Sequence, residues 1–161
     1  MSISSARFRK VLSRWPTGVS IVSSIAGDGC ALGLVVGSFG SISLDPPLVA
    51  FSVTKNSSSL AAIRESKKFC VNVLSAEQAH LVETFSSGDP KTRFSGIAHS
   101  FSPEGMPIVD GALAWIDATI EHEYDGGDHV IVLGHVQALG EGKAGTPLVF
   151  AQGTLGVFGM M

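Results

Sequence analysis

A lysine, an asparagine and three serines follow one another at residues 55–59, as Lys55-Asn56-Ser57-Ser58-Ser59, between an apolar run and a helical pattern. The first turn of a helix leaves four backbone N–H groups without partners, and the helix dipole places positive charge at that end. Together with hydroxyls and an ammonium group, these donors suit a phosphate. The same residues also suit simple helix capping, so the segment alone leaves both interpretations open.

A second segment, residues 35–43 (VVGSFGSIS), interrupts an apolar strand with two glycines and three serines. Glycine within a strand marks a bulge or the close approach of a ligand or another backbone. A flat aromatic ligand whose edge meets backbone N–H groups and hydroxyls would need such a strand. Serines on the solvated face of an ordinary sheet explain the composition equally well, and both interpretations stay open.

The third candidate is the run of residues 124–129 (YDGGDH), which is followed by the apolar stretch VIVL. If the two glycines form a two-residue hairpin turn, Asp125 pairs with Asp128 and Tyr124 pairs with His129. Tyr124 and His129 then share one face of the hairpin. A histidine beside a glycine turn is either a surface residue or a ligand contact.

Several common site patterns are missing from the sequence. The spacing of the histidines 122, 129 and 135 matches no zinc or iron signature, so no metal site is predicted. The glycines 27, 29 and 33 depart from the dinucleotide fingerprint, and neither a P-loop nor a G-x-S-x-G elbow occurs. Cys30 and Cys70 form no C-x-x-C and are expected to be reduced, packed thiols. A Rossmann dehydrogenase, an NTPase and a serine hydrolase are therefore excluded.

The elements that must position these segments are mostly strands. Apolar and β-branched runs between glycine or proline turns predict strands at residues 18–25, 31–44, 48–54, 69–74, 112–124, 129–139 and 148–158. Helical spacing predicts helices at residues 5–15 and 60–67, and a third from Ser75 through Phe85 that opens with a Ser75–Gln78 capping box. The expected architecture is a mainly β, antiparallel barrel with short peripheral helices, in a single domain that spans residues 1–161.

Composition narrows the class of protein further. The chain has 161 residues, of which 45% are hydrophobic and 16% charged, and its formal net charge is −3. This balance excludes a disordered chain and a basic protein that binds nucleic acid through its phosphates. Neither a secretory leader nor an apolar run of about 18 residues is present, so we expect a cytoplasmic protein without membrane contact.

Ordered motifs along the chain resemble the flavin reductase-like, FMN-binding family. The motifs are RWPTGV at 14–19, SFGSISLDPPLV at 38–49, F-x-VNVL at 69–74, RFSG at 93–96 and GDH at 127–129. Members of this family are the small reductase components of two-component flavin-dependent monooxygenases. The resemblance extends from about residue 7 to residue 158.

The resemblance implies a split β-barrel with Greek-key antiparallel strands, assembled as a homodimer that binds FMN, or FAD, near the subunit interface. Carried over residue by residue, the resemblance assigns the edge of the isoalloxazine to Val35, Val36, Gly37 and Ser38, with Ser41 close by. It assigns the flavin phosphate to Lys55, Asn56, Ser57, Ser58 and Ser59. It also places Phe94 near the flavin and assigns the contact with the nicotinamide to His129. The phosphate assignment falls on the segment that the helix argument proposed independently.

The implied reaction is hydride transfer from NADH or NADPH to the flavin, after which the reduced flavin passes to a separate oxygenase. No side-chain acid or base is required for the hydride step, because the cofactor carries the redox chemistry. The sequence departs from the family pattern in three places. Val35 and Gly37 stand where Thr or Ser is frequent, Phe150-Ala151-Gln152-Gly153 replaces an aromatic-Arg-Gly pattern, and Asp117 stands where a smaller or less polar residue is usual. The alternatives are a non-catalytic FMN-binding or electron-transfer protein on the same barrel, and a structural module without a ligand.

Overall fold

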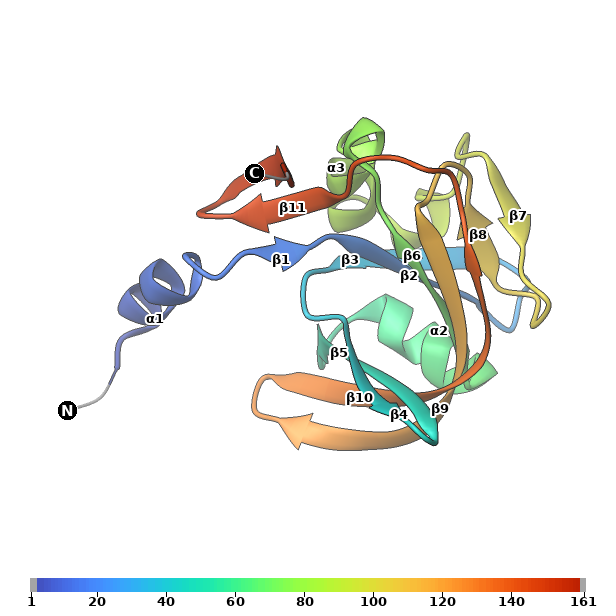
Figure 1. The fold of residues 1–161 in the computed structure, drawn as a ribbon. Helices are drawn as coiled ribbons and strands as arrows, with labels where there is room; N and C mark the ends of the chain where they lie inside the picture. Colours follow the sequence, from blue (N-terminus) through green and yellow to red (C-terminus); the bar gives the residue numbers. More distant parts are fainter. Residues whose placement is uncertain (1–2, 160–161) are drawn as a thin grey trace.

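The computed structural model describes residues 3–159 (Figure 1). The strands are β1 Thr17–Gly18, β2 Ser20–Ile25, β3 Ala31–Val36, β4 Gly40–Leu44, β5 Pro47–Thr54, β6 Lys68–Val73, β7 His99–Phe101, β8 Pro107–Val109, β9 Ala114–Gly126, β10 His129–Glu141, β11 Leu148–Ala151 and β12 Thr154–Val157. The helices are α1 Ser5–Leu12, α2 Ser58–Ser66 and α3 His80–Ser86, with short 3₁₀ turns η1 Ala76–Gln78 and η2 Pro90–Thr92.

One antiparallel sheet of seven strands, in the order β3-β2-β6-β9-β10-β5-β4, forms the body of the molecule. The sheet curves around a buried core, but its two outer strands do not pair, so the barrel is split along that edge. Helix α2 packs along β2, β3 and β6 and adds Leu60 and Ile63 to the core (Figure 1). The expected mainly β split barrel is confirmed.

The N-terminal helix and a small sheet extend away from the barrel. Strands β1, β11 and β12 form this sheet, and α1 precedes it at the far left of Figure 1. Helix α1 begins at a Ser4 cap and ends at Leu12, three residues earlier than predicted. Its apolar side chains, which include Phe8 and Val11, are exposed, because no described residue of the chain covers them.

Three predicted strands are each divided in the structure, and the first of them, 18–25, breaks at Val19 between β1 and β2. The run 31–44 breaks between Val36 and Gly40, so its second half is β4, which pairs with β5. The run 148–158 folds back at Gln152 and Gly153, whose φ angles are 52° and 78°, into the β11–β12 hairpin. Glycines and serines mark the first break and Gly153 lies in the second, but composition does not distinguish a bulge within a strand from the end of a strand, so these two runs were wrongly predicted as single strands.

The predicted register of the β9–β10 hairpin was also wrong. Gly127, with φ 82°, and Asp128 form the turn, so His129 pairs with Gly126 and Ile131 pairs with Tyr124. Tyr124 and His129 still share a face, since residues two apart on a strand point to the same side.

The helix after residue 75 begins with the predicted capping box, but it divides into η1 and α3. The helix predicted at 60–67 spans 58–66 instead and is capped by the Ser57 hydroxyl. Cys30 and Cys70 are both free thiols.

Asp117, the unexpected acidic residue, is completely buried on β9. Its Oδ2 accepts a hydrogen bond of 3.3 Å from the Glu104 backbone N–H and thereby ties the β7–β8 turn to the large sheet. Cys70 pairs with Asp117 across β6 and β9, and burial, followed by the charge of Asp117, raises the pKa of this thiol far above its usual range. Asp117 thus has a structural role.

Candidate functional site

A cavity of about 360 Å³ opens where the split edge of the barrel meets the β9–β10 hairpin. Its wall combines the end of β3, the start of the β3–β4 link, the end of β5 and the first residue of β10. The lining residues are Leu34, Val35, Val36, Gly37, Ser38, Ser52, Val53, Thr54 and His129. The structure therefore brings the segment 35–38 together with His129, although they are far apart in the sequence.

The β3–β4 link is held against β5 by Ser38. The Ser38 hydroxyl accepts a hydrogen bond of 2.9 Å from the Ser52 N–H and donates one of 3.1 Å to the Ser52 carbonyl. A Cβ on the neighbouring Gly37 would lie 2.7 Å from the Thr17 hydroxyl, so glycine permits the close approach of β1. These contacts form the cavity wall at the split edge of the barrel, where β3 and β4 do not pair with each other.

The register between β5 and β10 adds two hydroxyls that the sequence analysis missed. His129 pairs with Thr54, and Ile131 pairs with Ser52, so Ser52 and Thr54 lie on the same face as His129. The alternation of hydroxyls along the run LVAFSVT was the available signal. It becomes informative only when the pairing partner of that strand is known.

His129 is oriented by its neighbour in the turn. Its Nδ1 lies 2.6 Å from Oδ1 of Asp128. The hydrogen bond to His129, followed by its charge, holds the pKa of the Asp128 carboxyl below its ordinary value. With Nδ1 engaged in this way, Nε2 is the ring nitrogen left for a ligand.

The serines of the 55–59 segment serve the helix in the structure. Ser57 caps α2 by accepting from the Leu60 N–H at 3.4 Å, as the capping interpretation predicts. Ser59 is buried and donates to the Gly33 carbonyl at 3.2 Å. Asn56 and Ser58 are exposed beside the start of the helix and keep their side chains in solvent.

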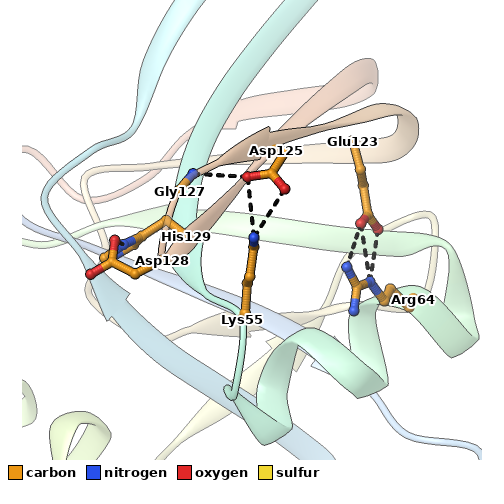
Figure 2. Close-up of polar contacts among 7 residues, drawn as sticks. All are labelled: Lys55, Arg64, Glu123, Asp125, Gly127, Asp128 and His129. Atoms are coloured by element: carbon orange, nitrogen blue, oxygen red, sulfur yellow. Dashed lines mark hydrogen bonds and ion pairs between the residues drawn. The ribbon is translucent and has the colours of Figure 1, made fainter.

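Lys55 points to the opposite side of the hairpin from His129. Its Nζ lies 3.0 and 3.1 Å from the two carboxylate oxygens of Asp125 (Figure 2). Beside this pair, Arg64 of α2 makes a two-pronged ion pair with Glu123 of β9 at 2.7–3.1 Å. These four side chains, with Tyr124 and Val130, line a second open cavity of about 360 Å³.

Six of the predicted flavin residues lie outside both cavity walls: Ser41, Phe94, and the residues Asn56, Ser57, Ser58 and Ser59 described above. Ser41 is exposed on β4. Phe94 is buried, and its ring packs edge-on against Phe85 and His99 at centroid distances of 4.9 and 5.1 Å. Its place near a flavin stays a prediction.

Within residues 3–159, no three histidine, cysteine or acidic side chains gather in a group that could hold a metal ion. In the same part of the chain, every helix is too short or too polar to cross a membrane.

The first cavity fits one edge of a flat, partly polar ring. Apolar side chains of β3 line it together with several hydroxyls and one imidazole. Such a combination of apolar lining and a few placed polar groups is typical of cofactor sites. No pair of carboxylates or other acid–base arrangement lines this cavity, so its residues are suited to bind and orient a ligand.

Comparison with known proteins identifies similar chains. The family described as "Flavin reductase like domain" matches residues 12–159. A reductase subunit of a flavin-dependent monooxygenase, HsaB from Rhodococcus jostii, is 46% identical over 94% of this chain and 77% of its own length. The FMN reductase (NADH) SmoA from Agrobacterium fabrum is 36% identical over 96% of this chain and 86% of its own. The crystal structure of a nitrilotriacetate monooxygenase component B homolog from Mycobacterium thermoresistibile superposes with a TM-score of 0.91 at 42% identity, covering 96% of this chain and 86% of that one.

Proposed function

This chain belongs to the flavin reductase-like family, and we propose that it reduces FMN with NADH or NADPH as the hydride donor. The chain is an NAD(P)H-dependent flavin reductase that supplies reduced flavin to a partner monooxygenase. The observation that carries the site assignment is the single cavity that unites residues 35–38 with His129. When bound, the flavin supplies the hydride-accepting chemistry.

The residues of the first cavity would orient the two rings. Val35, Val36 and Gly37 present a flat strand end, and backbone groups at this end would meet the edge of the isoalloxazine. Ser38 holds the strand end in place through Ser52. Since the hydride step needs alignment of the rings without a protein proton donor, rigid walls are the main contribution of the chain.

His129 would contact the nicotinamide in the same cavity. Asp128 fixes the ring through Nδ1, so Nε2 can donate to or accept from the carboxamide of the dinucleotide. Neither NADH nor NADPH is favoured by a charged side chain at this wall.

Lys55 and the start of α2 would receive the flavin phosphate. The first-turn N–H groups of a nine-residue helix and an adjacent ammonium group form an anion-binding combination. Because FAD carries a phosphate at the same position of its ribityl chain, this assignment accommodates FAD as a second flavin.

We further propose that the enzyme is a homodimer. Helix α1 has no buried residue, and the exposed apolar side chains of α1, of the β11–β12 hairpin and of the residues that follow each of them include Phe8, Trp15, Phe150 and Phe158. Extended apolar surface of this kind is typical of an interface. Light scattering coupled to size exclusion would test the dimer, and a monomer at micromolar concentration would contradict it.

The free thiols are consistent with the expected cytoplasmic location.

The direct test of function is absorbance at 340 nm while the purified protein meets NADH or NADPH with FMN, with FAD or without flavin. We expect oxidation that depends on added flavin and is faster with FMN. Tight flavin binding without oxidation would indicate an electron-transfer role instead, and would direct attention to Ala151 and Gln152. Absence of flavin binding would overturn the assignment of the cavity.

A further inference from the structure

The lysine assigned to the flavin phosphate already has an anionic partner within the chain. Nζ of Lys55 is bonded to both oxygens of Asp125, at 3.0 and 3.1 Å (Figure 2). Asp125 is held in place from behind, because its Oδ1 also accepts the Gly127 N–H at 2.9 Å. The carboxylate therefore occupies the position in front of Lys55 that a phosphate would take.

The rest of the second cavity offers no spare positive charge. Arg64, the other cation on its wall, is bonded through Nε and Nη2 to Glu123. The residues that line this cavity thus include two cations and two carboxylates, and each cation is paired with one carboxylate. An incoming phosphate must exchange with one of these carboxylates to gain a cation.

We propose that Asp125 competes with the flavin phosphate for Lys55 and so limits the affinity of the enzyme for FMN, which favours release of the reduced flavin. The proposal rests on the proposed function, since it takes Lys55 as the phosphate contact. Asp125 is a specificity-determining residue in this scheme: it weakens the binding of phosphorylated flavins and leaves riboflavin unaffected.

The exposure of the pair makes the exchange feasible. The side chains of Lys55 and Asp125 are 44% and 75% exposed. Ion pairs at such positions contribute little stability, because water and salt screen them. A phosphate, which carries about 1.5–2 negative charges, attracts the ammonium group more strongly than a carboxylate does.

Displacement of Asp125 does not remove its charge from the site. The Gly127 N–H and the tight turn keep the carboxylate at the hairpin, so it remains near the bound phosphate as a like charge. FMN therefore loses affinity twice, through the broken ion pair and through repulsion. A reductase that hands its product to another enzyme benefits from such weak binding.

The test is the Asp125→Asn variant, which keeps the acceptor for the Gly127 N–H and removes the negative charge. We expect its dissociation constant for FMN to fall about fivefold, the factor that corresponds to the upper range of exposed ion pairs. The FMN dissociation rate in stopped flow should fall by a similar factor, while the constant for riboflavin stays unchanged. The matched control is Glu77→Gln, which removes the same charge from another exposed ion pair, that with Lys143, outside both cavities; it should change FMN affinity less than twofold.

The same measurements in a Lys55→Ala background separate this proposal from the one on which it rests. If Lys55→Ala weakens FMN but not riboflavin, and Asp125→Asn has no further effect in that background, competition for Lys55 is supported. If Lys55→Ala weakens FMN selectively but Asp125→Asn leaves FMN affinity unchanged or lowers it, the competition is refuted and the phosphate assignment survives. Equal tightening by Glu77→Gln would also refute it. If Lys55→Ala affects FMN and riboflavin alike, the phosphate assignment itself fails, and the competition fails with it.

Discussion

The asparagine of the F-x-VNVL motif, Asn72, is expected to be a structural residue whose loss destabilises the barrel. It is completely buried on β6. Its Nδ2 donates to the Ile21 carbonyl at 3.2 Å and to the Ser23 hydroxyl at 3.1 Å, and it approaches the Pro107 carbonyl at 3.4 Å. Its Oδ1 accepts the Val109 N–H at 2.8 Å. One side chain thus connects β2, β6 and β8.

Replacement of Asn72 with alanine leaves the buried N–H of Val109 without this acceptor. An orphaned buried donor costs about 1–3 kcal/mol, and the space left by the amide adds to this cost. We expect the free energy of unfolding to fall by about 2–4 kcal/mol in total. For a chain of this size, that corresponds to a drop in melting temperature of roughly 5–15 °C.

Urea denaturation followed by fluorescence, at one protein concentration, measures this loss. The control is Gln137→Ala, which removes an exposed amide from β10 and should change stability by less than about 0.5 kcal/mol. FMN affinity of the folded Asn72→Ala variant should match that of the wild type, since Asn72 lines neither cavity. A stability loss below about 1 kcal/mol would refute the argument from the orphaned donor.

Three further changes test the site and the core. His129→Ala should raise the KM for NADH about fivefold, as expected for loss of one hydrogen bond, with FMN affinity nearly unchanged; an equal loss of both would contradict the nicotinamide assignment. Gly134→Ala should destabilise the protein by about 1–3 kcal/mol in thermal unfolding, because a Cβ at Gly134 would overlap the Phe69 ring; a wild-type melting temperature would show that the ring can move. In the native protein, Cys30 should react with a thiol reagent at pH 8 while Cys70 reacts only in denaturant, since burial raises the pKa of Cys70 well above that pH; rapid modification of two thiols would contradict this.

Patterns within one element were readable from the sequence. The Ser75–Gln78 capping box depends on two residues three apart, so their types suffice to predict it. The run Asn56–Ser59 offered several candidate caps, and the structure identifies Ser57 as the one that caps α2. The strands of the sheet likewise follow from apolar runs bounded by turns. The ordered motifs then led to the split barrel, because they restrict the chain to one known arrangement of such strands.

Contacts between distant segments were not readable in the same way. The break after β3 depends on the bond between Ser38 and Ser52, and nothing in the run 31–44 indicates that β5 lies beside it. The hairpin register depends on which of two glycines takes the positive φ angle. A Cβ at Gly126 would lie 3.3 Å from both Ile131 and the His129 carbonyl, whereas Gly127 lies in open space, but composition alone cannot distinguish them.

That one-residue difference in register determines how the hairpin serves the site. Paired residues share a face, so Asp125 lies with Val130 on the side of α2, while His129 lies with Thr54 on the side of the first cavity. Figure 2 shows the consequence: Asp125 reaches Lys55, and Asp128 reaches His129. One short turn therefore holds the proposed phosphate contact with one aspartate and the proposed nicotinamide contact with the other. Because Asp128 lies in this two-residue turn and Asp125 only two residues before it on β9, any change in the length of the turn would alter flavin affinity and the use of NADH together.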